Sequence, residues 1–105
     1  MTFEEIFNKV KDMFQDTDVS HIQEHLAYQF NITGEGEGIF YVEVKDGQLH
    51  IEPYEYYDRD AIFICKAETL FKIISGKTDP VLAFTIGKLK VEGSIEQALK
   101  LKNFL

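Results

Sequence analysis

The chain has 105 residues, a size typical of one domain, and we expect residues 1–105 to fold as a single unit. Its content of 45% hydrophobic and 28% charged residues is that of a globular protein and argues against long disordered or low-complexity segments. Eighteen acidic and eleven basic residues give a net charge of −7, which on average repels nucleic acid and anionic membranes. We therefore predict no nucleic-acid partner.

Cys65 is the single cysteine of the sequence, which rules out an internal disulfide and a cysteine-based zinc cluster. The first residues lack the basic start and the apolar run of a signal peptide. The longest apolar run, Ala61 to Cys65, is far short of the roughly 20 residues that span a membrane. The last residues do not match a peroxisomal address. These features predict a soluble, cytoplasmic protein with at most transient membrane contact.

The N-terminal segment has the pattern of an amphipathic helix that ends near Gln15. Thr2 and Glu5 have the spacing of a capping box. Apolar residues follow at steps of three and four, which gives the helix one apolar stripe: Phe3, Ile6, Phe7, Val10 and Phe14.

From His25 onward, the period of the apolar residues changes to two, which predicts strands. The first strand covers residues 26–32, and the second covers 40–44 after a glycine-rich turn at 34–38. Asp46-Gly47 is a typical hairpin turn, and a third strand follows at 49–51. The continuous apolar run 61–65 predicts a fourth strand after an acidic, tyrosine-rich crossing at 54–60. We expect these four strands to form a meander.

The C-terminal part returns to helical patterns. Residues 70–74 form a broad apolar face that ends at Gly76, and Asp79-Pro80 begins a short helix, apolar nearly all round, that must be covered on several sides. A fifth strand at 89–91 and a last helix from Ser94 follow, with Ile95, Ala98 and Leu99 directed inward. The predicted fold is α+β, order α-β-β-β-β-α-α-β-α, with a five-stranded, mostly antiparallel sheet covered on one side by about four helices.

His21-Ile-Gln-Glu-His25 matches H-x-x-E-H, a zinc motif in which both imidazoles share one helical face. Here a strand pattern begins at His25, and positions four apart in a strand lie about 13 Å from each other, too far to share one ion. We therefore predict that His21, Glu24 and His25 bind no metal.

The remaining polar groups predict no enzyme, no catalytic residue and no cofactor. The glycine-rich segment 34–38 carries two carboxylates and lacks a following helix, so it suits a turn rather than a phosphate loop. The acidic residues at 52, 55, 58 and 60 have neither calcium-loop nor acid/base spacing and predict a solvated face. Cys65 has no neighbour in sequence that would lower its pKa.

The C-terminal third contains a run of short motifs: Ser75-Gly-Lys-Thr-Asp-Pro80, Ala83-Phe84, Gly87-Lys-Leu-Lys-Val91, Gly93 and Ala98-Leu-Lys-Leu101. Upstream lie Thr33-Gly-Glu-Gly, Tyr41-Val-Glu-Val and Lys45-Asp-Gly47. In order and spacing, over residues 20–103, these motifs resemble those of the sterol carrier protein 2 family. The resemblance is closest to a compact, stand-alone member of bacterial type.

The resemblance implies a sheet and helices that enclose a hydrophobic tunnel for a lipid ligand: a sterol, fatty acid, fatty acyl-CoA or phospholipid. We expect an apolar pocket of roughly 300–1,000 Å³. The pattern leaves open which strand face looks inward. The candidate lipid-binding residues are Phe40, Val42, Ile62, Ile64, Phe71, Ile74, Val81, Leu82, Phe84, Ile86, Leu99 and Lys102.

Two positions depart from the family pattern. Lys66-Ala67 stands where Ser-Pro is common, which removes a hydroxyl helix cap, and Lys102 stands where glutamine is frequent. The acidic net charge differs from the basic animal carriers and argues against sterol transfer between anionic membranes.

The main functional hypothesis is non-catalytic binding and carriage or presentation of a lipid. The alternative is a protein interaction module with a filled core, which includes a homodimer. An enzyme of unidentified type is a third reading, for which no spacing suggests a nucleophile and a base.

Overall fold

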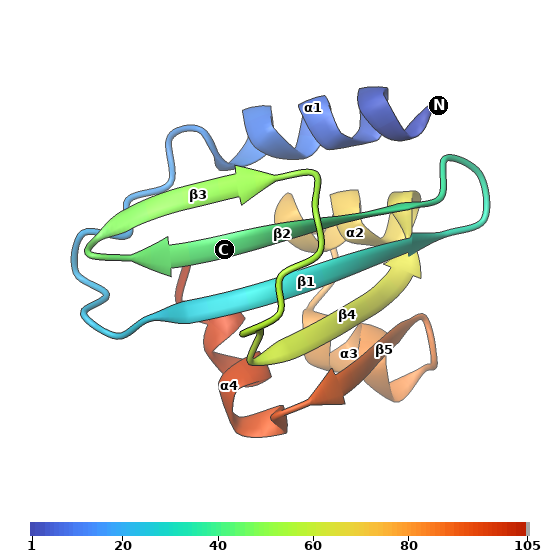
Figure 1. Cartoon of the computed structure of the whole chain (residues 1–105). Coiled ribbons are helices and arrows are strands. Elements are labelled where there is room, and N and C mark those ends of the chain that lie inside the picture. Colours follow the sequence, from blue (N-terminus) through green and yellow to red (C-terminus); the bar gives the residue numbers. More distant parts are fainter. Residues whose placement is uncertain (105) are drawn as a thin grey trace.

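Figure 1 shows the computed structural model, which describes residues 1–104. Within these residues the five strands form one sheet in the order β3-β2-β1-β4-β5. Three neighbouring pairs are antiparallel and β1–β4 is parallel. The α+β fold and the predicted order of elements are confirmed: α1 (Phe3–Phe14), β1 (Leu26–Thr33), β2 (Gly38–Lys45), β3 (Gln48–Glu52), β4 (Ala61–Lys66), α2 (Ala67–Ile74), α3 (Pro80–Thr85), β5 (Leu89–Gly93), α4 (Ile95–Leu99) and the 3-10 helix η1 (Lys100–Phe104).

The first four strands do not form the predicted meander. β4 pairs with β1 in parallel, Tyr28 opposite Ala61 and Asn31 opposite Ile64, instead of lying beside β3. Residues 53–60 therefore cross one face of the sheet from edge strand β3 to β4 (Figure 1). The apolar character of β4 suits this central place, because β4 has a neighbouring strand on each side.

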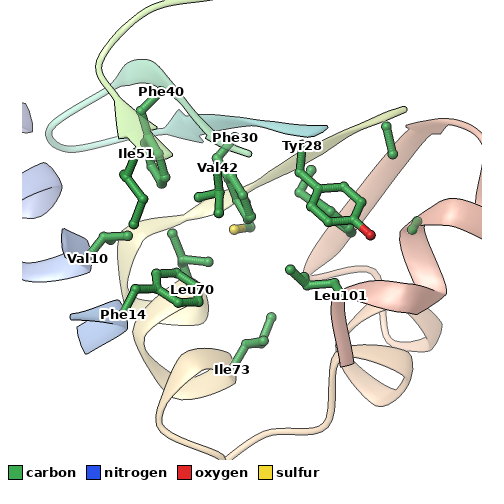
Figure 2. Close-up of a cluster of buried hydrophobic side chains, with 14 of the residues drawn as sticks. Val10, Phe14, Tyr28, Phe30, Phe40, Val42, Ile51, Leu70, Ile73 and Leu101 are labelled. Carbon is green, nitrogen blue, oxygen red and sulfur yellow. The ribbon is translucent and has the colours of Figure 1, made fainter. Parts of the chain in front are cut away.

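The helices cover the other face of the sheet, as predicted. Thr2 and Glu5 form the expected capping box, in which the Glu5 N–H donates to Thr2 Oγ1 at 3.2 Å and the Thr2 N–H donates to Glu5 Oε1 at 2.8 Å. The stripe of α1 is buried against the sheet, and the Phe7 ring meets Phe40 edge-on at 5.8 Å between centroids. Phe40, Phe30 and Leu70 lie within the layer between sheet and helices (Figure 2).

The crossing segment is attached to the sheet by a polar cluster. Gln29 on β1 is only 4% exposed, and its Oε1 accepts from the Tyr56 N–H at 3.3 Å and from Arg59 Nη1 at 3.4 Å. Glu43 on β2 is 8% exposed; its Oε2 accepts a hydrogen bond from the Tyr56 hydroxyl and lies 2.6 Å from His25 Nε2. Gln29 and Glu43 therefore hold Tyr56 and Arg59 of the crossing segment against the sheet.

The cluster changes two pKa values. Burial raises the pKa of Glu43, but hydrogen bonds from Tyr56 and His25 outweigh burial, and the net pKa is lowered. The hydrogen bond to Glu43 raises the pKa of Tyr56 to about 12. Both shifts favour the same state at neutral pH, an ionised carboxylate that accepts from a neutral phenol.

We expect Glu43→Ala to lower the free energy of unfolding by about 1.5–3 kcal/mol at neutral pH, because Tyr56 and His25 lose a charged acceptor. The pKa of Glu43 is lower in the folded state than in the unfolded state. The stabilisation by its ionised carboxylate is therefore present above the unfolded pKa of 4.5 and is lost as the pH falls through the folded pKa. Urea titrations at neutral and acidic pH measure the difference, which should shrink in acid. Exposed Glu52→Ala is the control, and an equal effect of both substitutions would contradict the prediction.

Candidate functional site

An apolar cavity of about 210 Å³ lies between α3, α4 and the sheet edge formed by β4 and β5. Lys102 is the one titratable side chain among the described lining residues. The others are apolar: Phe63, Pro80, Val81, Phe84, Leu89, Val91, Ile95, Ala98, Leu99 and Leu101. This composition suits a hydrocarbon chain better than a polar ligand.

Helix α3 forms the outer wall because the sequence begins and ends it sharply. Asp79 Oδ1 accepts from the Val81 and Leu82 N–H groups at 2.7 and 3.3 Å, and Pro80 fixes the backbone of the first turn. Gly87 takes a φ of 81°, which ends the helix.

The expectation that α3 is covered on several sides is wrong. Ala83 is fully buried, whereas Val81, Leu82, Phe84 and Ile86 are 43–56% exposed. The physical reason is position: α3 lies at the edge of the sheet near β5, with no further layer outside it (Figure 1). An exposed apolar cluster of this kind marks a binding surface more often than scattered apolar residues do.

Helix α4 forms the second wall. Ser94 Oγ caps it by accepting from the Gln97 N–H at 3.1 Å, and the Tyr28 hydroxyl donates to the Gln97 carbonyl at 2.6 Å. Burial raises the pKa of Tyr28, so the phenol remains a donor. Ala98 is buried as predicted, but Ile95 and Leu99 are 52% and 53% exposed rather than packed inward, because they border the cavity mouth.

The structure brings four of the twelve candidate residues to this cavity: Val81, Phe84, Leu99 and Lys102. A second hollow of about 590 Å³, on the other side of α3, is bordered by three more, Ile64, Leu82 and Ile86, together with several polar side chains.

The other candidates lie elsewhere. Phe40 and Val42 are fully buried in the core, and Ile74 packs partly buried against it. Phe71 is partly buried beneath the Lys9 ammonium, 4.3 Å from its ring centroid.

Ile62 and Ile64 do not line this cavity. Strand side chains alternate between faces, and Phe63, which lies between them, lines the cavity. Ile62 and Ile64 therefore belong to the crossed face, where they pair with Gln29 and Asn31 of β1.

Seven lining residues were not among the candidates: Phe63, Pro80, Leu89, Val91, Ile95, Ala98 and Leu101. Phe63 and Val91 are register partners across β4 and β5, so both fall on the same face. Alternation around Phe63 was the available signal, but the apolar run Ala61–Cys65 gives both faces of β4 the same character.

The cavity is smaller than the predicted pocket, because large side chains fill the middle of the layer. Phe30 stacks on Phe40 at 5.0 Å and on Phe63 at 5.2 Å between ring centroids. Figure 2 shows Leu70, Ile73 and Leu101 directed toward the same layer from the helices. The apolar cavity lies outside this filled region, beside β5.

Lys102 lies at the rim of the cavity, with its Nζ 3.4 Å from Asp79 Oδ2. The pKa of Asp79 is lowered chiefly by the hydrogen bond from the Val81 N–H and further by Lys102. One carboxylate thus caps α3 and pairs with the ammonium of η1.

The three residues of the H-x-x-E-H motif have separate surroundings. Glu24 Oε2 lies 2.9 Å from Lys100 Nζ, His25 contacts Glu43, and His21 is exposed. Residues 1–104 contain no group of three His, Cys, Asp or Glu side chains that could hold a metal ion.

Comparison with known proteins decides the family. The model of the SCP-2 sterol transfer family matches residues 3–105. The chain belongs to this family. Membership implies lipid or sterol binding and transfer, and SCP2 domains are in general non-catalytic.

Curated relatives of this SCP2 domain include Hydroxysteroid dehydrogenase-like protein 2 of Rattus norvegicus, 36% identical over 97% of the chain and 19% of the relative. Sterol carrier protein 2 of Arabidopsis thaliana is 35% identical over 71% of the chain and 64% of the relative. The chain spans about a fifth of the length of the dehydrogenase-like relative that it matches.

Solved structures of Sterol Carrier Protein 2 Like 2 from Aedes aegypti share the fold. The crystal structure has a TM-score of 0.69 at 20% identity and covers 97% of this chain and 94% of its own. A solution structure described as palmitated has a TM-score of 0.67 at 20% identity and covers 96% of this chain and 91% of its own. None of the helices within residues 1–104 has the length and apolarity to cross a membrane.

Absence of bound metal stays a prediction. We expect elemental analysis of the purified SCP2 domain to find far less than one zinc per chain, because His25 contacts Glu43 while His21 is exposed and the two imidazoles do not converge on one point. Stoichiometric zinc that is lost on His21→Ala would contradict this.

We expect Phe84→Ala to enlarge the cavity at little cost in stability, within about 1 kcal/mol, because the ring is 49% exposed and its removal leaves no closed void. Phe30→Ala, by contrast, should cost about 3–5 kcal/mol, because that ring is 1% exposed. Thermal or urea unfolding of both variants measures the difference. A loss at Phe84 as large as that at Phe30 would show that Phe84 is a core residue.

Proposed function

We propose that residues 1–105 act as one non-catalytic lipid-binding domain, which holds the acyl chain of its ligand in the cavity between α3, α4 and β4–β5 and carries or presents that lipid. The observation that carries this proposal is the nearly all-apolar lining of the cavity, with a single ammonium at the rim. The palmitated Aedes aegypti neighbour supports a fatty acyl ligand in a related fold.

Burial of hydrocarbon supplies the binding energy in this proposal. Each methylene removed from water contributes about 0.8 kcal/mol, so even a part of an acyl chain has a substantial driving force. The cavity of about 210 Å³ is small, and a longer chain requires Phe84 and Leu99 to move outward. Both side chains are about half exposed, so their displacement disturbs little core packing.

The chemistry of the lining supports a non-catalytic role. Among the described lining residues, Lys102 is the one group that can carry charge. Cys65, the single cysteine, is 4% exposed, and burial raises its pKa to about 12, which keeps the thiol protonated at neutral pH.

A protein interaction module is the second candidate. The exposed apolar side chains of α3 and α4 support it, and so does the greater length of the dehydrogenase-like relatives, in which a domain of this kind has other parts beside it. Such a module would use the outer surface of α3 and leave the cavity empty.

Native mass spectrometry of freshly purified protein tests the proposal directly. We expect co-purified lipid, or saturable binding of an added fatty acid, with a longer preferred chain in Phe84→Ala. A protein that binds no fatty acid, acyl-CoA, phospholipid or sterol in any chain length would refute lipid carriage. A tight dimer with an empty interior would favour the interaction module.

Lys102 is the proposed head-group contact. We expect Lys102→Gln to weaken fatty-acid binding several-fold, as for an exposed ion pair, and to leave binding of the fatty alcohol of equal chain length unchanged. Asp79→Asn should strengthen fatty-acid binding, since asparagine still caps α3 but no longer holds the ammonium. Exposed Lys77→Gln is the matched control. Equal affinities for acid and alcohol before and after substitution would remove the head-group role.

A further inference from the structure

Charge is unevenly distributed along the chain. Residues 1–60 carry fourteen acidic and four basic residues, whereas residues 61–105 carry seven lysines and four acidic residues. The overall charge of −7 therefore hides a C-terminal part that is net positive. Four of the acidic residues, Glu4, Glu5 and Asp12 of α1 and Glu52 of β3, lie at the opposite edge of the sheet from α3 and β5 (Figure 1).

The positive part surrounds the most exposed apolar helix. Leu82 of α3 and Ile86, the residue that caps its C-terminus, are 54% and 56% exposed and border the second hollow. Four lysines and one carboxylate border the same hollow: Lys66, Lys72, Lys88, Lys90 and Glu68. Glu68 pairs with Lys72 at 3.2 Å, and within residues 1–104 no carboxylate forms an ion pair with any of the other three lysines.

We propose that this surface, formed by Leu82, Ile86 and the lysines at 66, 88 and 90, docks on an anionic lipid bilayer. Apolar side chains enter the interface while lysines remain at the phosphate level, the arrangement of interfacial membrane anchors. The protein is 27–34 Å across, and charges are screened over about 10 Å at 0.1 M salt, so the acidic edge weakly opposes docking. The net charge alone predicts repulsion from an anionic bilayer, whereas the local distribution of charge predicts attraction.

A second copy of the chain fits this surface less well. Two copies that met through α3 would bring the unpaired lysines of one against those of the other, which is unfavourable. An anionic bilayer supplies the opposite charge and an apolar interior together. The inference goes beyond lipid carriage, because Leu82 and Ile86 do not line the proposed acyl cavity and docking requires no bound ligand.

Vesicle co-sedimentation of the whole chain tests the charge. The probes are vesicles of phosphatidylcholine alone and vesicles with about 30% phosphatidylglycerol. We expect binding to the anionic vesicles only, and loss of binding at about 0.5 M sodium chloride. Lys88→Glu with Lys90→Glu should weaken binding more than tenfold, because each lysine near the surface is worth about fivefold. The control, Lys11→Glu with Lys45→Glu, changes the net charge equally on residues outside the proposed surface and should have a small effect.

A second pair of variants tests the apolar contact. Leu82→Gln with Ile86→Gln should weaken vesicle binding at least tenfold. The control is Tyr54→Gln with Tyr57→Gln, on the crossing segment, where the rings are 65% and 92% exposed. Circular dichroism establishes that each variant is folded, and fatty-acid binding in the same variants shows whether the cavity is intact.

Three results would overturn the docking proposal. The first is no preference for anionic vesicles, and the second is vesicle binding that is unchanged in the α3 and lysine variants. The third is a wild-type dimer that Leu82→Gln with Ile86→Gln converts to a monomer without any effect on vesicle binding. Fatty-acid binding that survives in these cases would leave the cavity proposal standing. Loss of fatty-acid binding with docking retained would refute the cavity proposal alone.

Discussion

Three phenylalanine rings lie side by side across the middle of the sheet: Phe40 of β2, Phe30 of β1 and Phe63 of β4. The antiparallel pairing of β1 with β2 brings Phe30 opposite Phe40, and the parallel pairing of β1 with β4 brings Phe30 opposite Phe63. The rings fill the centre of the layer, and interiors packed at normal density have no room for a ligand beside them. The cavity is consequently confined to the β5 edge, where α3 and α4 cover the sheet incompletely.

The crossed face of the sheet has a different role. Buried polar groups are costly unless they are hydrogen-bonded, and Gln29 and Glu43 both obtain partners from residues 53–60 or from His25. Asp60 adds a further connection, because its carboxylate accepts from the Ala27 N–H at 2.9 Å. The acidic segment that the sequence suggests is merely solvated is therefore partly structural, and it holds β4 in the place that the phenylalanine contacts require.

Local patterns predicted most elements of this fold. Capping residues and apolar periodicity are properties of neighbouring residues, so α1, the β2–β3 hairpin and the start of α3 could be placed from the sequence. The strand that pairs with β4 could not be predicted from the sequence, because pairing between strands far apart in the chain leaves no local signal. The same limit applies to the cavity. Val81, Phe84, Leu99 and Lys102 were found through the family resemblance, but Phe63 required knowledge of which face of β4 meets the helices.

All the described side chains that line the cavity come from residues 63–102, and α1, β1, β2 and β3 contribute none of them. Proteins open locally in cooperative units, at a free-energy cost below that of global unfolding. An outward movement of α3 would break contacts within the C-terminal part, and one of α4 would also break the hydrogen bond from Tyr28 to the Gln97 carbonyl. The β1–β2–β3 ladders would stay intact in both cases. The N-terminal part can thus serve as a rigid support, against which the walls of the cavity exchange between closed and open states without loss of the fold.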